Sequence, residues 1–360
     1  MNKKLYVFLA RNAIHLRELI VKTANIFVPE KYTVIQKIQL FNFQYILKAA
    51  VELHIADLLQ NKTKSIEELA AESNTNPESL YRLLRALSGE GFFKELPEKK
   101  FRNTKASKFL CENHKNSIKY LVLHQLNNGI VEMLMNLKYS VKTGIPASSK
   151  VFGTDPFDYM SKHPENNELY NKAMADGTKL LSSVLSLYFP FYKYKTIADV
   201  GGGNGLLLSL ILTKKNHSEG FVIDLPHVIE KPHNNIISRK LKDKIIFVPE
   251  NITENVSINA DLYILKNVLH LFGDNKCITI LKNIKASAHT GSKILIIEMS
   301  LCEPNKYSYG KLYDIQMLVT MKNGKERSSE EYQMLFNKAG LRFIKEIKTI
   351  GQFSIFEAKV

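Results

Sequence analysis

One histidine and two glutamates in the C-terminal half are the side chains best suited to acid–base chemistry. Lys266 and His270 follow the apolar run 262–265, Glu298 closes the next apolar run, and Glu326 lies in a polar loop before the last predicted helix. The carboxyl ends of parallel strands meet at one edge of an open α/β sheet, where ligands bind. A histidine there can accept a proton while carboxylates hold its tautomer and stabilise the resulting cation. We therefore predict His270 as a general base, with Glu298 and Glu326 as its orienting partners.

A glycine-rich turn lies upstream of these residues. The apolar run 197–200 ends at Gly201-Gly-Gly-Asn-Gly205, and an apolar segment with helical character follows immediately. Strand, tight turn and helix N-terminus in this order form nucleotide-type cofactor sites, although a plain structural turn has the same local pattern. The next predicted strand ends in Asp224, about twenty residues further on, where a carboxylate can bind a ribose diol. This acid favours a ligand-binding turn over a plain one.

The elements that must position these residues alternate between strands and helices from Thr196 onward, which indicates a mainly parallel sheet. Predicted strands cover 197–200, 221–224, 245–248, 262–265 and 293–298, and helices are expected after Gly205, Val228, Asp274 and Ser328. The chain closes with a predicted hairpin of strands 342–347 and 353–358 around Gly351.

The N-terminal third has a different pattern. Apolar residues recur at helical spacing over 34–59, Ser65 and Pro77 open two further helices, and 92–101 indicates two short strands. This winged-helix pattern raises the alternative of a DNA-binding regulator, with Arg82 and Arg85 on the recognition helix. That helix offers no Asn or Gln to read bases between Leu80 and Leu87, so a packing or dimerisation role is favoured and no nucleic-acid partner is predicted.

Composition indicates an ordinary globular protein. The 360 residues include 45% hydrophobic and 24% charged residues, and the net charge of +15 comes from lysines spread along the whole chain rather than from one basic block. Cys111, Cys277 and Cys302 have no paired or metal-like spacing, so neither a disulfide nor a metal site is expected and a cytoplasmic location is predicted. No apolar run reaches the roughly twenty residues of a membrane span. Residues 3–27 are predicted to form an amphipathic helix.

The combined motifs resemble a known family. The glycine spacing G-x-G-x-G after Asp199 resembles motif I of S-adenosylmethionine-dependent methyltransferases, whose cofactor has a ribose but no phosphate. From about residue 35 the chain resembles the small-molecule O-methyltransferases of plants and bacteria, which include caffeate, hydroxyindole and polyketide-tailoring enzymes. The motifs occur in the family's order: Leu80-Tyr-Arg-Leu-Leu-Arg-Ala-Leu87, His163-Pro-Glu165, Asp199 to Gly205, Asp224-Leu-Pro-His227, Leu265-Lys-Asn-Val-Leu-His270 and Gly324-Lys-Glu-Arg327.

This resemblance implies a fold and a function. It implies an α/β protein whose class I methyltransferase domain, a Rossmann-like seven-stranded sheet ending in an antiparallel hairpin, follows a mostly helical winged-helix dimerisation domain. We predict dimerisation over residues 1–110, a helical connection lining the substrate pocket over 111–190, and S-adenosylmethionine binding over 191–360. The implied activity is methylation of a phenolic or enolic hydroxyl on an aromatic small molecule by a homodimer. A relative that binds the cofactor but performs C-methylation, hydroxylation or a pericyclic reaction is the main alternative.

The resemblance also assigns residues. His270, Glu298 and Glu326 match the catalytic base and its carboxylate partners. The cofactor-binding positions are Asp199, Gly201, Gly203, Asp224, Leu225, Asn251, Ile252 and Lys266, and the acceptor-pocket positions are Met174, Met317 and Met321. Two positions depart from the family pattern: Leu271-Phe272 replaces the usual Asp-Trp after the histidine, and Asn251 stands where an acid usually meets the adenine.

Overall fold

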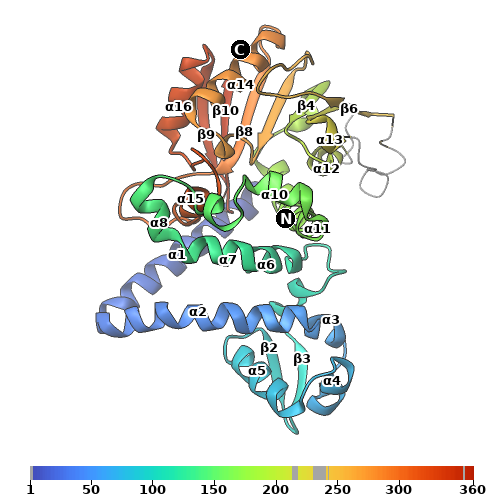
Figure 1. Ribbon diagram of the computed structural model, residues 1–360, viewed down its shortest axis with the longest axis vertical. Helices are drawn as coiled ribbons and strands as arrows, with labels where there is room; N and C mark the ends of the chain where they lie inside the picture. Colours follow the sequence, from blue (N-terminus) through green and yellow to red (C-terminus); the bar gives the residue numbers. More distant parts are fainter. Residues whose placement is uncertain (1–2, 213–217, 230–240, 242, 352) are drawn as a thin grey trace. The chain divides into compact units, whose positions relative to one another are not determined.

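The computed structural model describes residues 3–212, 218–229, 241, 243–351 and 353–360 (Figure 1), and the statements below concern these residues. The chain forms two compact units. One contains the described residues of 3–7, 132–162 and 178–360, and the other contains 8–131 and 163–177. The boundaries at residues 110 and 190 that we expect from the sequence stay a prediction.

A seven-stranded sheet forms the centre of the C-terminal unit. Its order is β6-β5-β4-β7-β8-β10-β9, and only β10 runs antiparallel to its neighbours. The strands are β4 (Thr196–Val200), β5 (Glu219–Asp224), β6 (Ile245–Pro249), β7 (Leu262–Lys266), β8 (Lys293–Met299), β9 (Arg342–Lys348) and β10 (Phe353–Lys359). Every predicted strand is present, so the expected mixed sheet with its C-terminal hairpin is confirmed.

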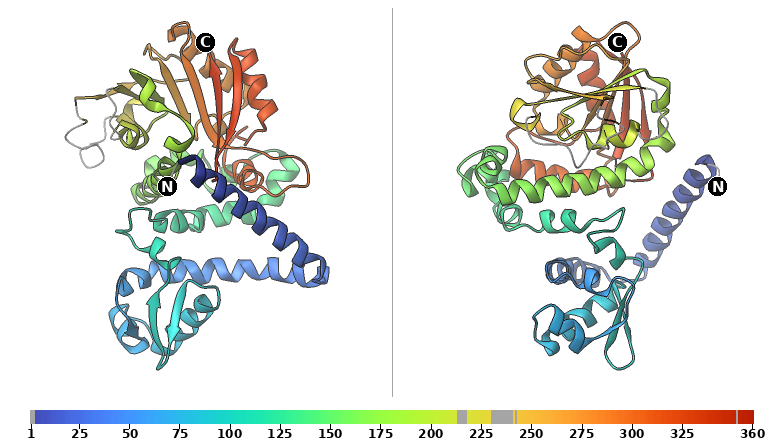
Figure 2. Two further views of the ribbon diagram at one scale, coloured as in Figure 1. Left: turned by 180° about the vertical axis from the view of Figure 1, so that it is seen from behind. Right: turned by 90° about the vertical axis from the view of Figure 1, so that its right-hand side faces the viewer.

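Helices cover both faces of this sheet because its strands carry apolar residues on both sides (Figures 1 and 2). On one face, β4 contributes Ala198 and Val200 to a buried cluster that also contains residues of α14 (Asp274–Ser287) and α16 (Ser329–Lys338). On the other face, Ile197 packs in a cluster with α12 (Leu206–Leu212) and the end of α11 (Pro164–Tyr188). The parallel sheet is therefore buried on both faces. Loops follow the carboxyl ends of its parallel strands, and this end of the sheet is called its carboxyl edge below.

The sequence patterns did not predict one helix near this edge. Helix α15 (Tyr309–Thr320) precedes the loop that carries Glu326. Ser308 caps it by accepting a hydrogen bond from the Lys311 amide, a signal that is readable in the sequence. The shorter helices α8 (Leu137–Thr143), α9 (Ala147–Val151), α10 (Pro156–Lys162) and α13 (Pro226–Ile229) complete this unit.

The other unit has the expected winged-helix elements. They are α2 (Glu30–Glu52), α3 (Ile55–Leu59), β1 (Lys64–Ser65), α4 (Ile66–Glu72), α5 (Pro77–Gly89), β2 (Phe93–Leu96), β3 (Lys100–Asn103) and α6 (Lys119–Gln125), with α7 (Asn128–Met135) at its border. Ser65 opens α4 as predicted and forms a capping box with Glu68, and the Asn76 side chain caps α5. Helix α1 (Lys3–Ile26) confirms the helix predicted over 3–27. No described helix is both long enough and apolar enough to cross a bilayer.

Candidate active site

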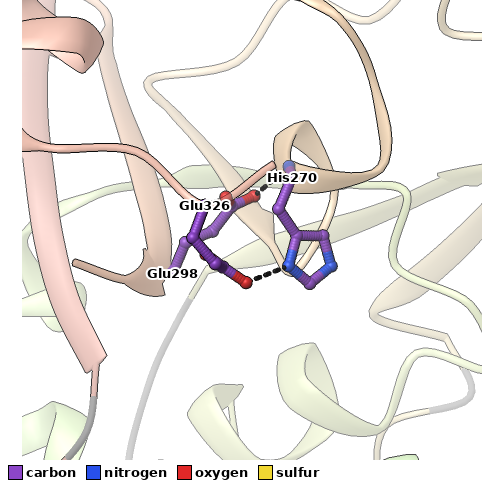
Figure 3. A group of neighbouring side chains, drawn as sticks. All are labelled: His270, Glu298 and Glu326. Carbon is purple, nitrogen blue, oxygen red and sulfur yellow. Dashed lines mark hydrogen bonds and ion pairs between the residues drawn. The ribbon is translucent and has the colours of Figure 1, made fainter. Parts of the chain in front are cut away.

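His270 and Glu326 form a hydrogen-bonded pair at the carboxyl edge of the sheet (Figure 3). His270 lies in η4 (Leu269–Leu271), directly after β7, and its Nδ1 is 2.7 Å from Oε1 of Glu326. A carboxylate can only accept here, so Nδ1 carries the proton and Nε2 is left as the proton acceptor. Burial lowers the pKa of His270, but the Glu326 hydrogen bond and the charges of Glu298 and Glu326 outweigh it, so the pKa lies above its ordinary value.

The Glu326 loop packs directly against the backbone of His270. The Lys325 amide donates to the His270 carbonyl at 2.9 Å, and the Glu326 amide donates to Oδ1 of Asp314 on α15 at the same distance. A side chain at Gly324 would lie 2.9 Å from the His270 carbonyl oxygen, so glycine permits this close approach. Burial raises the pKa of Glu326, whose carboxyl is 1% exposed, while the bonded imidazole opposes this rise.

Glu298 contacts the backbone of the histidine turn rather than the imidazole ring. Its fully buried carboxylate accepts hydrogen bonds at Oε1 from the amides of Val268, Leu269 and His270, at 3.0, 2.7 and 3.3 Å. Its Oε2 accepts from the Tyr332 hydroxyl. The structure thus brings the three predicted residues together, with Glu298 bonded to the turn that carries the imidazole, and their catalytic roles stay a prediction.

The same three side chains also carry atoms that can bind metal ions. Their potential ligand atoms lie within 4.8 Å of one another. However, both oxygens of Glu298 already accept hydrogen bonds from buried donors, and Glu326 is bonded to the imidazole. The geometry therefore favours a base with supporting carboxylates over a cation site.

These contacts predict different effects for two conservative substitutions. We expect Glu298→Gln to lower the free energy of unfolding by about 1–3 kcal/mol, because the neutral amide keeps only one acceptor oxygen for the three backbone amides and the Tyr332 hydroxyl that the carboxylate accepts from. We expect Glu326→Gln to change stability little but to lower the pKa of His270, because the neutral amide no longer stabilises the imidazolium. Thermal unfolding and NMR titration of the histidines would measure both effects, with the exposed Glu330→Gln as a control. Equal stability of the Glu298 and Glu330 variants would contradict the backbone role of Glu298.

The glycine turn and Asp224 are joined by hydrogen bonds. Oδ2 of Asp224 accepts from the Gly203 amide at 2.8 Å, and Oδ1 accepts from the Leu225 amide at 2.7 Å. Gly203 has a φ of +58°, a conformation that favours glycine, and no atom lies within 4 Å of where its Cβ would be. Burial raises the pKa of Asp224, and these two amides counteract part of that rise. The turn and the acid predicted to bind a ribose therefore form one rigid unit.

Asp199 and Lys266 lie at the carboxyl ends of two neighbouring strands, β4 and β7, with Asp199 one residue before the end of β4. Asp199 is 2% exposed, its Oδ2 has no hydrogen-bond partner among the described residues, and burial raises its pKa to about 7. The half-buried Lys266 ammonium donates to Oγ1 of Thr178 at 3.0 Å, and burial lowers its pKa. A buried acceptor without a partner is costly unless a ligand supplies a donor.

The raised pKa of Asp199 predicts a pH-dependent effect of Asp199→Asn on the ligand-free protein. The folded protein holds a proton on Asp199 up to about pH 7, whereas the unfolded chain loses it near 3.8. Stability therefore falls as pH rises from about 4 to 7. We expect Asp199→Asn to remove this loss and to stabilise the protein by up to about 4 kcal/mol at pH 8, with little effect at pH 4. Thermal unfolding at pH 4 and pH 8 measures the difference in stability between Asp199→Asn and the parent protein. An equal difference at both pH values would contradict the raised pKa of Asp199.

The remaining predicted cofactor residues have mixed surroundings. Asn251 follows β6, donates from Nδ2 to Oε1 of Glu254 at 2.6 Å, and accepts at Oδ1 from the amide and hydroxyl of Thr253 at 3.1 and 2.8 Å. The side-chain amide of Asn251 is therefore hydrogen-bonded within the turn that contains it. Ile252 packs against the core, and Leu225 is 38% exposed. Contact of Asn251, Ile252 and Leu225 with a cofactor stays a prediction.

The predicted acceptor-pocket methionines do not all lie in one unit. Met317 is a buried residue of α15, and Met321 follows that helix, half-buried. Met174 lies on α11 in the other unit. Sequence reasoning missed Asp314, Arg327 and Tyr332, which all support the His270–Glu326 pair. Of these, Arg327 was part of a motif identified from the sequence.

Comparison with known proteins identifies the family of the chain. The sequence model of the O-methyltransferase domain matches residues 134–342, and that of the O-methyltransferase dimerisation domain matches 35–113. Phenazine O-methyltransferase PhzM of Lysobacter antibioticus is 32% identical over 87% of this chain and 91% of its own length. The crystal structure of LaPhzM aligns with a TM-score of 0.83 at 30% identity, covering 92% of this chain and 99% of that one. An 8-amino-8-demethylriboflavin N,N-dimethyltransferase of Streptomyces davaonensis is 26% identical over 88% of this chain and 92% of its own.

The fold and its turn are those of a class I methyltransferase. The family match covers more than half of the chain, so the chain belongs to the O-methyltransferase family. It is an S-adenosylmethionine-dependent O-methyltransferase with the family's dimerisation domain.

Proposed function

We propose that the chain methylates a phenolic or enolic hydroxyl of an aromatic small molecule, with His270 as the general base. The observation that carries this proposal is the His270–Glu326 pair, whose hydrogen bond leaves Nε2 as the proton acceptor at the carboxyl edge of the sheet. The family membership supplies the reaction type, and the site supplies a base whose partners are already in place.

Residues at the same edge suit S-adenosylmethionine. Each oxygen of Asp224 accepts one backbone hydrogen bond and keeps capacity for a ribose hydroxyl. The unpartnered Asp199 oxygen suits the cofactor's ammonium, and Lys266 suits its carboxylate. Gly203 leaves room beside the turn, whereas a Cβ at Gly201 would lie 2.7 Å from Cγ2 of Val268, so glycine there lets the turn pack against the segment after β7. Asn251, Ile252 and Leu225 would flank the adenine end. When bound, the cofactor supplies an electrophilic methyl group on a sulfonium.

The chain's own contribution is proton removal and positioning. His270 would take the hydroxyl proton at Nε2, so that the acceptor oxygen becomes the nucleophile toward the methyl group that the bound cofactor would supply. Glu326 stabilises the imidazolium that forms, and Glu298 holds the backbone turn that carries the ring. Holding the reacting atoms in line provides most of the acceleration, and general-base catalysis adds roughly 10²–10⁴-fold.

The acceptor is proposed to be flat and largely apolar. Leu271 and Phe272 follow the base and are half-buried, where typical relatives have an acid and a tryptophan. Met317 and Met321 would line the acceptor pocket as adaptable apolar surfaces. One relative acts on a phenazine and another is an N,N-dimethyltransferase, so both hydroxyl and amine acceptors belong in a test.

Mass spectrometry of products tests the proposed reaction. The purified protein would be incubated with S-adenosylmethionine and a panel of phenolic, phenazine and polyketide acceptors, each paired with its amine analogue. We expect a methyl gain on a hydroxyl, together with formation of S-adenosylhomocysteine. Methyl gain on the amines alone would replace O-methylation by N-methylation. Acceptor turnover without cofactor consumption would move the protein to the non-methylating alternative, and retarded DNA in a gel-shift assay would support a regulator.

We also propose a homodimer formed through the dimerisation domain. Helix α2 exposes large apolar side chains, including Ile38 at 67% and Phe41 at 62%, within the segment that matches the dimerisation family. Exposed apolar surface of this kind marks an interface. We expect light scattering to give twice the chain mass of 41.1 kDa. The double substitution Ile38→Asp and Phe41→Asp should give a folded monomer, whereas the control Lys37→Ala should remain a dimer. A monomeric parent protein would overturn this proposal.

We propose a cytoplasmic location, because the thiols of Cys111, Cys277 and Cys302 are unpaired.

A further inference from the structure

Arg327 is fully buried and bonds several backbone carbonyls around the histidine turn. Its Nη1 donates to the carbonyls of Leu269 at 3.0 Å and Lys325 at 3.3 Å, and its Nη2 donates to the carbonyl of Phe272 at 2.7 Å. Its Nε and Nη2 also donate to Oδ1 of Asp274, at 3.1 and 2.8 Å. One guanidinium therefore occupies the space between two chain segments that are far apart in sequence.

These two segments carry the proposed base and its carboxylate. Leu269 directly precedes His270, Phe272 follows two residues later, and Lys325 directly precedes Glu326. The position of Arg327 thus determines how the turn bearing the imidazole lies against the loop bearing its acceptor. The fork of a guanidinium is planar and rigid, so it can hold these carbonyls in one geometry, which a flexible ammonium cannot do.

We propose that Arg327, held by Asp274, is a positioning residue that sets the contact between His270 Nδ1 and Glu326 Oε1. The proposal rests on the proposed role of His270 as the base. Arg327 acts through backbone carbonyls and touches neither the imidazole nor the Glu326 carboxylate among the described contacts.

Arg327→Lys tests this proposal because it keeps the charge and removes the fork. The charged groups that act on the His270 ring are Glu326, Glu298 and Lys266, and none of them is altered. The readout is the pKa of His270, measured by NMR during a pH titration of the protein in the presence of S-adenosylhomocysteine. The His270 resonance is assigned as the one that is lost in His270→Gln. We expect the pKa to fall by about one unit, toward that of Glu326→Gln, because the imidazolium loses its close carboxylate. With an acceptor identified in the mass-spectrometric screen, turnover should fall roughly tenfold to a hundredfold while KM for S-adenosylmethionine stays unchanged.

Glu357→Gln is the matched control, because Glu357 is a buried carboxylate paired with Lys293 near the other end of β8. Both variants should lose stability, but only Arg327→Lys should shift the pKa of His270. If that pKa is unchanged in folded Arg327→Lys, or shifts equally in Glu357→Gln, the positioning role is overturned. Should Arg327→Lys not fold, Asp274→Ala, which removes the acceptor of Nε and Nη2, is expected to shift the His270 pKa in the same direction, and an unchanged value overturns the proposal. The NMR shift requires no turnover, so a His270 variant with full activity would refute the proposed base without deciding the role of Arg327.

Discussion

His270→Gln should lower turnover by roughly 10²–10⁴-fold while leaving the affinity for S-adenosylhomocysteine nearly unchanged. The substitution removes the proposed base. The residues proposed to bind the cofactor are unaltered, because Asp199, Asp224 and Lys266 lie in β4, β5 and β7 rather than in the turn that carries His270. Steady-state kinetics with an acceptor identified in the mass-spectrometric screen measure turnover, and calorimetry measures the affinity for S-adenosylhomocysteine. His289→Gln is a suitable control, because His289 also bonds a carboxylate, Asp261 at 3.1 Å, but is 45% exposed at the other end of the sheet.

The pH dependence of the unaltered enzyme should agree with this role. The pKa of His270 lies above its ordinary value of 6.5, so the imidazole is already protonated below that raised pKa and cannot accept the hydroxyl proton. Turnover should therefore fall as pH decreases through a value above 6.5, and Glu326→Gln should move this fall to lower pH. An acid limb that stays in place in Glu326→Gln, or full activity of His270→Gln, would remove His270 from the mechanism.

Asp224→Ala should weaken S-adenosylhomocysteine binding by about 10²–10⁴-fold. The carboxylate is proposed to accept two ribose hydroxyls, and each charge-assisted hydrogen bond contributes about 1.5–3 kcal/mol. The substitution also frees the amides of Gly203 and Leu225 and so loosens the turn itself. Asp224→Asn separates these effects, because the amide can still accept one backbone hydrogen bond while it lacks the charge.

Asp261 provides the matched control for Asp224. Its Oδ2 also accepts two backbone amides, from Lys195 at 2.8 Å and Thr196 at 3.0 Å, but these lie where β4 begins, away from the edge where β4 and β5 end. Asp261→Asn should lower stability and leave calorimetric affinity within about twofold of the parent protein, since it touches no predicted ligand position. If both aspartate variants bind S-adenosylhomocysteine as the parent does, the assignment of Asp224 fails.

The amino-acid sequence by itself determined the order of elements and the edge at which the chemistry lies. Apolar runs of strand length such as 197–200 and 262–265 end in glycines or charged residues, and in a parallel sheet those ends must meet on one side. The pairing of Asp224 with the glycine turn follows from the same rule, because β4 and β5 are adjacent in sequence and in the sheet. Local patterns are sufficient for such features, since each depends on a short segment and its nearest neighbour.

Only the tertiary structure decided which partner each side chain bonds. Glu298 and Glu326 are both carboxylates near His270, yet one bonds the backbone of the turn and the other bonds the ring. Arg327 lies beside Glu326 in sequence, but its partners Leu269 and Asp274 are more than fifty positions away. Spacing along the chain carries no information about such contacts, because the choice among nearby donors and acceptors depends on how separate segments pack and on which polar groups that packing buries.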